Sequence, residues 1–101
     1  MAEPVYSKNG VPIRFADERW AHITEEHSEL ASLRMEIMET VANPTAIFAG
    51  NQGELLAVRE VESGKYLVVV YRESQQDGFI ITAFLTRKAH TLRRRQQLWP
   101  L

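Results

Sequence analysis

The chain has 101 residues, of which 45% are hydrophobic and 25% are charged, which is typical of one globular domain over residues 1–101. It contains no cysteine, which excludes a disulfide framework and thiolate metal sites and favours a reducing compartment such as the cytoplasm. Its apolar stretches are only strand-length, so we expect no membrane span.

Charge is unevenly distributed along the chain. The net charge is −1, but residues 87–101 contain five basic residues and no acidic residue, which leaves seven basic and thirteen acidic residues in the rest. A basic end on an acidic chain suggests a polyanionic partner such as RNA. The alternative is a solvated tail that keeps the protein soluble or pairs with the acidic helices.

The first half of the chain predicts a hairpin and two helices. Asn9-Gly10 is a strong turn signal because both residues tolerate positive φ. Asp17 is typical of the N-cap of a first helix, and Ser28 of a second N-cap. The second helix is predicted by apolar residues at helical spacing, Leu30, Leu33, Ile37, Met38 and Val41. Proline at position 44 ends this helix.

The second half predicts four strands, at residues 46–49, 54–61, 65–73 and 78–86. The short loops between them favour antiparallel neighbours. We therefore predict an α+β fold: an N-terminal hairpin and two helices packed on a four-stranded antiparallel β-sheet, with a basic C-terminal tail. Residues 88–97 are a candidate helix within that tail.

Alternation along the strands predicts a polar sheet face. Phe79, Ile81, Ala83 and Leu85 form an apolar set that should meet the helices. The opposite face is expected to gather Arg59, Thr82, Thr86 and either Tyr71 or Arg72, since the register cannot be read from the sequence. The alternative is that the threonines are ordinary strand residues and that Arg59 is a surface charge.

Two histidines in the first helix are candidate acid–base residues. His22 and His27 lie five residues apart, about 140° around a helix, so the pair alone does not predict a metal site. Glu26 shares a face with His22 and could orient its imidazole. The alternative is that both histidines only cap or pack, and His90 is expected on the surface.

The chain holds the residue types that cleave RNA by 2′-hydroxyl attack: a base, a cation that stabilises the phosphorane, and an acid. We predict no metal and no cofactor, because the sequence lacks a zinc pattern and a phosphate-binding glycine loop.

Five segments carry a family resemblance: Arg19-Trp-Ala-His-Ile23, His27-Ser-Glu-Leu30, Val41-x-Asn-Pro44, Leu67-Val-Val-Val-Tyr71 and Ile81-Thr-Ala-Phe-Leu-Thr86. Together they resemble the barnase–EndoU–colicin–RelE-like nuclease superfamily, over roughly residues 11–100. One departure is Ser28, where related proteins often have proline in a His-Pro-Glu motif; serine still suits a helix cap.

The resemblance implies N-terminal helices on a four-stranded antiparallel sheet and a site of helix histidines with polar or basic sheet residues. It implies acid–base roles for His22 and His27 and phosphate binding by Arg59. Thr82 and Thr86 would lie on the active face. Residues predicted to bind substrate are Tyr71, Arg72, Arg87 and Lys88. Some members of such folds act by binding alone.

Three hypotheses follow. The first is a metal-independent, toxin-like or phage-linked ribonuclease. The second is a non-catalytic module that binds RNA or protein. The third is a small oligomerising domain that uses the apolar end Leu98-Trp99-Pro100-Leu101. The expected partners are accordingly RNA, an antitoxin-like protein or a second copy of the chain, and not a membrane.

Overall fold

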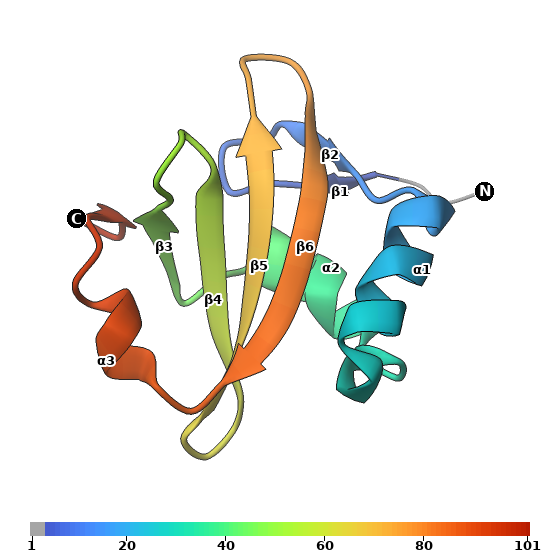
Figure 1. Cartoon of the computed structure of the whole chain (residues 1–101). Coiled ribbons are helices and arrows are strands. Elements are labelled where there is room, and N and C mark those ends of the chain that lie inside the picture. The colour runs from blue at the N-terminus through green and yellow to red at the C-terminus, as the bar shows by residue number, and fades with distance from the viewer. Residues whose placement is uncertain (1–3) are drawn as a thin grey trace.

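The computed structural model describes residues 4–101. Its main element is a curled sheet of seven strands (Figure 1). The strands are β1 (Val5–Tyr6), β2 (Pro12–Arg14), β3 (Ala46–Ala49), β4 (Leu55–Glu62), β5 (Lys65–Glu73), β6 (Gly78–Thr86) and β7 (Gln97–Trp99). The helices are α1 (Asp17–Glu26), α2 (Arg34–Ala42) and α3 (Ala89–Leu92), with a 3₁₀ turn at Ser28–Leu30.

The strand order is β1-β2-β6-β5-β4-β3-β7. The prediction of a four-stranded sheet is therefore wrong, although its four strands are present and antiparallel to one another. The N-terminal hairpin turns at Gly10, whose φ is 78°, and extends the sheet because β2 pairs in parallel with β6. At the other edge β7 pairs with β3, so the basic tail is a folded part of the sheet.

The helical segment after α1 also differs from the prediction. Leu30 lies in the 3₁₀ turn, and α2 begins only at Arg34, so the expected continuous helix is interrupted between them. Asp17 is the first residue of α1, whose N-cap is Ala16. Leu30 is nevertheless fully buried, so the change of chain direction keeps this side chain in the core.

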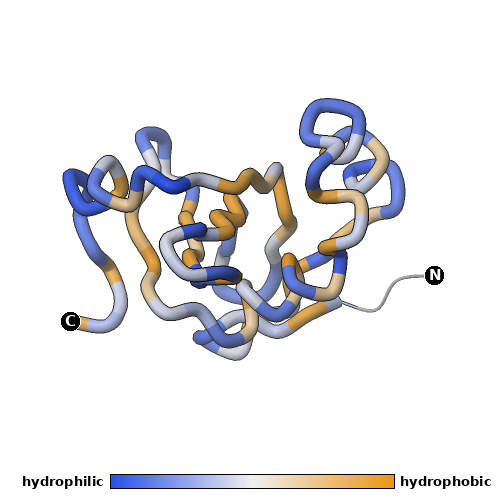
Figure 2. Tube along the Cα trace, turned by 90° about the horizontal axis from the view of Figure 1, so that it is seen from below, coloured by the Kyte–Doolittle hydropathy of each residue, from blue (hydrophilic) through white to orange (hydrophobic). Residues whose placement is uncertain are grey.

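The sheet curls around α2, which packs against β1 on one side and against β4 and β5 on the other. Ile37 and Val41 of α2 are fully buried against Leu67 and Val69 of β5. The hydrophobic stretches accordingly lie in the middle of the molecule and the hydrophilic ones in its outer loops (Figure 2). The two ends of the sheet approach each other, since the Lys8 ammonium lies 4.4 Å from the centre of the Trp99 ring.

A β-bulge in β6 changes which of its residues face the core. Val70 pairs with Thr82, but Tyr71 pairs with Ile80, so Ile81 is the extra residue. Ile80 is therefore buried in the core around α2, whereas Phe79 is 41% exposed. The expectation that Phe79 would be buried against the helices is wrong, because the bulge reverses the alternation beyond it.

No helix within residues 4–101 is long and apolar enough to cross a membrane.

Candidate functional site

One face of the central strands is turned away from α2, and we call it the open face. Register places its side chains in rows across β4, β5 and β6. The rows are Glu60, Tyr66 and Thr86, then Val58, Val68 and Phe84, then Leu56, Val70 and Thr82, and finally Arg72 and Phe79. The middle of this face is thus apolar and aromatic, and its ends are polar.

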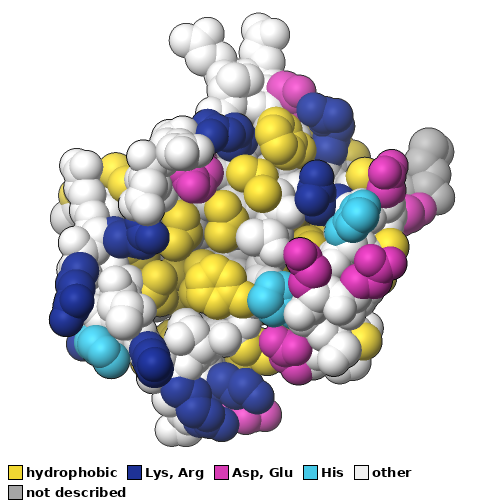
Figure 3. All heavy atoms as spheres, in the orientation of Figure 1, with side chains coloured by type: hydrophobic (Ala, Val, Ile, Leu, Met, Phe, Trp, Pro, Cys, Tyr) yellow, Lys and Arg dark blue, Asp and Glu magenta, His cyan; other side chains and the backbone are white. Residues whose placement is uncertain are grey.

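Helix α3 covers only part of the open face. Leu92 is 6% exposed and packs on Phe48, Val58 and Val68, over β3, β4 and β5. Phe84 and Val70, nearer β6, stay half-buried. Figure 3 shows the result from the front: a hydrophobic centre with Lys and Arg side chains above it, below it and on the α3 side.

Helix α1 forms the opposite rim, alongside β6. Arg19 lines a shallow depression with Phe79 and Ile80, whereas Glu29, just after α1, lines a pocket with Leu85. Helix α1 therefore follows β6 from its start towards its end (Figure 1). His22 lies on the same helical stripe as Arg19 and is exposed, which places it on the side of α1 that borders the open face.

His27 follows the last residue of α1 and is half-buried, with its side chain 35% exposed. Its Nδ1 lies 3.6 Å from Oε2 of Glu29. A carboxylate beside one ring nitrogen orients the imidazole and leaves the other nitrogen for proton exchange. The pairing predicted for His22 and Glu26 is not among the ion pairs of the described residues. The acidic neighbour that the structure shows is Glu29, and it lies beside the other histidine, His27.

The predicted substrate-binding cations fall at the two ends of the open face. Arg72 lies beside Phe79 and donates a hydrogen bond of 2.9 Å to the carbonyl of Gln52. Arg87 and Lys88 follow Thr86 directly and are exposed. The backbone N–H of Lys88 donates to Thr86 Oγ1 at 3.0 Å, which keeps the Lys88 backbone beside the last row of the face.

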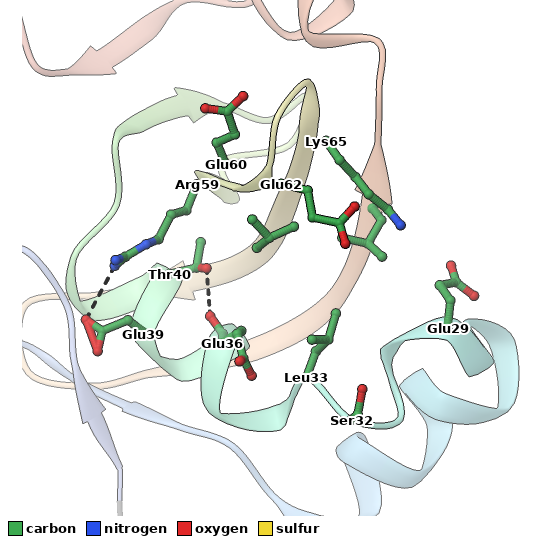
Figure 4. A pocket seen from close by; sticks show the side chains of 12 residues that line it. Glu29, Ser32, Leu33, Glu36, Glu39, Thr40, Arg59, Glu60, Glu62 and Lys65 are labelled. Atoms are coloured by element: carbon green, nitrogen blue, oxygen red, sulfur yellow. Dashed lines mark hydrogen bonds and ion pairs between the residues drawn. The ribbon is translucent and has the colours of Figure 1, made fainter.

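Arg59 lies on the opposite face of the sheet, so the expected gathering of Arg59 with Thr82 and Thr86 is wrong. Its guanidinium donates to the carbonyl of Asn43 at 3.1 Å and lies 3.4 Å from Oε2 of Glu39. Figure 4 shows this arginine directed at α2. The physical reason is register: Arg59 pairs with Leu67, a core residue on the α2 side.

The pocket that Arg59 lines has a volume of about 440 Å³ and is rich in carboxylates. Its acidic lining residues are Glu29, Glu36, Glu39, Glu60 and Glu62, against two cations, Arg59 and Lys65. Like charges disfavour a polyanion, so this pocket is a poor place for an RNA phosphate.

Tyr71 is also on the α2 side and is only 1% exposed. Burial, followed by the negative charge of Glu73, raises the pKa of its hydroxyl far above the usual value. A side chain buried in the core cannot contact RNA. Of the two alternatives for the site face, the structure places Arg72 there and Tyr71 in the core.

Replacing Tyr71 with phenylalanine should make folding less sensitive to alkaline pH. The folded-state pKa of Tyr71 lies above its unfolded value of 10.0, so its contribution to stability is complete below pH 10 and is lost as the pH rises further. Urea unfolding followed by circular dichroism between about pH 8 and 11 should show a steeper fall for the wild type than for Tyr71→Phe. Parallel pH profiles would contradict this account of the buried hydroxyl.

Several residues of the open face were not among the predicted site residues. Tyr66, Phe84 and Phe79 place aromatic rings there, and Arg19 and Arg93 contribute cations from the two rims. Alternation within β5 already put Tyr66 on the side of Arg72, which was the available signal. The position of Arg93 depends on the fold of the tail and had no local signal.

No group of three or more His, Asp or Glu side chains suited to a metal ion occurs within residues 4–101. No protein-family model, no curated protein and no solved structure matches the chain.

Proposed function

We propose that this protein is a small ribonuclease that holds single-stranded RNA on the open face and cleaves it by attack of a ribose 2′-hydroxyl on the adjacent phosphate. One observation carries the proposal. The open face joins an aromatic centre, cations at its ends and two histidines on one rim. Aromatic rings stack on bases and cations pair with phosphates, which is how proteins hold single strands. The absence of cysteine supports a cytoplasmic location.

The proposed roles follow from position. His27, oriented by Glu29, accepts the 2′-hydroxyl proton, and His22 donates a proton to the leaving 5′ oxygen. The 2′ oxygen forms a bond to phosphorus as the bond to the 5′ oxygen breaks. The products are a 2′,3′-cyclic phosphate and a 5′-hydroxyl end. Thr82 and Thr86 are hydroxyl donors to the phosphate oxygens, and Arg87 and Lys88 supply positive charge.

The test of this proposal is cleavage of a fluorescent single-stranded RNA by the purified chain in EDTA, with the products identified by mass spectrometry. We expect cyclic phosphate ends. RNA that stays intact at every pH from about 5 to 8, the range in which histidine changes charge, would overturn the catalytic proposal.

Binding without catalysis is the second candidate, and it is favoured by the position of Arg59. The predicted set of His22, Arg59 and Thr82 is divided between the two faces of the sheet. A pure binding module predicts salt-dependent association with RNA and no effect of either histidine. The salt dependence alone does not separate the two candidates, so cleavage has to be measured beside it.

The open face can be tested by neutralising its cations. Arg72→Gln and Arg87→Gln should each weaken RNA binding and lower the slope of log affinity against log salt by about 0.7, the value for one phosphate contact on a single strand. The matched control is Arg59→Gln on the opposite face, which should leave both quantities unchanged. Fluorescence anisotropy at several salt concentrations measures this. An equal loss of RNA affinity in Arg59→Gln would contradict binding of RNA on the open face.

A further inference from the structure

The open face contains a pocket where α3 crosses it, and we call it the α3 pocket. Its volume is about 370 Å³, within the range of small-molecule sites. The residues that decide its chemistry are Phe48, Val58, Glu60, Tyr66, Arg93 and Gln97. Phe48 and Val58 are almost fully buried, Tyr66 is half-buried, and Arg93 is exposed at the mouth.

We infer that the α3 pocket binds one nucleobase of the RNA, with a preference for bases that carry an exocyclic amino group. This inference rests on the proposed function, because it assumes that RNA lies on the open face. The apolar walls and the Tyr66 ring suit the flat faces of a base, which stack on aromatic side chains. The Glu60 carboxylate at the edge of the pocket disfavours a phosphate inside it, whereas Arg93 at the mouth suits one.

The preference for an amino group follows from the hydrogen-bond acceptors of the pocket. Glu60 accepts one hydrogen bond, from the backbone N–H of Gly64 at 2.8 Å, through its Oε2. Glu60 borders both pockets, and in Figure 4 its carboxylate points away from the other labelled side chains of the acidic pocket. Gln97 donates its amide to the carbonyl of Pro100 at 2.8 Å, which leaves its own oxygen to accept. Adenine, cytosine and guanine each have an exocyclic amino donor for such acceptors. Uracil has no amino group, and its one N3–H donor is flanked by two carbonyl oxygens, which a carboxylate repels.

The α3 pocket borders the proposed cleavage site through one of its lining residues, Tyr66. Tyr66 pairs directly with Thr86 across β5 and β6, so their Cβ atoms are about 5 Å apart. A base stacked on Tyr66 therefore brings its ribose and phosphate towards Thr86 and the α1 rim. Base recognition and cleavage would then act on neighbouring groups of one RNA strand.

The test is titration of the full ¹⁵N-labelled chain with the four nucleoside 5′-monophosphates, followed by NMR. We expect saturable shifts at Tyr66, Ala89 and Leu92. UMP should bind about tenfold more weakly than AMP, CMP or GMP, because a hydrogen bond to a charged group contributes at least this factor. Shifts that do not saturate, or that lie away from α3, would overturn the inference.

Two variants with matched controls separate stacking from base selection. Tyr66→Leu keeps an apolar side chain and should weaken binding of AMP by about 5- to 100-fold, the usual effect of removing one stacking ring. Tyr6→Leu on the exposed edge strand β1 should have no effect. Glu60→Gln can donate as well as accept, so it should abolish the discrimination against UMP, whereas Glu62→Gln should retain it. Unchanged binding by folded Tyr66→Leu, or unchanged discrimination by Glu60→Gln, would contradict the inference.

The outcomes distinguish this inference from the proposed function. Mononucleotide binding in the α3 pocket by a protein that leaves RNA intact would refute the ribonuclease and support the pocket. Cleavage of RNA by a protein whose α3 pocket binds no nucleotide would support the ribonuclease and refute base binding in the pocket.

Discussion

His27→Ala should lower the rate of RNA cleavage by about 10²- to 10⁴-fold, the usual contribution of one general acid–base group. RNA affinity should stay within twofold of the wild type, because the imidazole lies on the rim and not among the cations. The expected result is therefore a loss in kcat with little change in KM. Cleavage assays and anisotropy on the same RNA measure the two quantities.

The matched control for His27→Ala is His90→Ala. His90 is exposed on α3, the opposite rim, and does not line the α3 pocket, so its removal should leave the rate unchanged. Glu29→Gln is a second variant. It keeps the shape of the side chain but removes the charge 3.6 Å from Nδ1, and it should alter the pH–rate profile. Full cleavage activity in both His27→Ala and His22→Ala would exclude histidine catalysis and would mean that other groups transfer the protons.

Ile37→Ala should reduce the free energy of unfolding by about 2–5 kcal/mol, as expected for a large-to-small change in a core. Ile37 is completely buried at the centre of α2, and the sheet curls around this helix, so its neighbours cannot move in to fill the cavity. This loss is a large part of the total stability of a domain of this size, about 5–15 kcal/mol. Urea unfolding followed by circular dichroism measures the change.

Met35→Ala is the matched control on the same helix. Met35 is 71% exposed, so its truncation creates no cavity and should change stability by less than about 0.5 kcal/mol. Both variants place alanine in α2, so any gain in helix propensity is similar. Equal losses in the two variants would mean that α2 does not form the centre of the core.

Local chemistry determined much of this protein from the sequence alone. Asn9-Gly10 predicted the first turn, and alternation between turn signals predicted the four strands β3 to β6 to within one residue at each end. The apolar spacing of Ile37 and Val41 predicted that this stretch is a helix with a buried face. These features depend on neighbours in the chain, so they can be read from short windows.

Contacts between distant residues decided the rest. Only the tertiary structure pairs β2 with β6 and β7 with β3, and so turns a predicted four-stranded sheet into a seven-stranded one. The tertiary structure also places Arg59 on the α2 side and Thr82 on the open face, because register is set by the pairing between strands and not by either strand itself. A single extra residue in β6, Ile81, exchanges the faces of Phe79 and Ile80, and no local signal marks it. The composition of the open face, on which both proposals rest, is therefore a property of the assembled sheet.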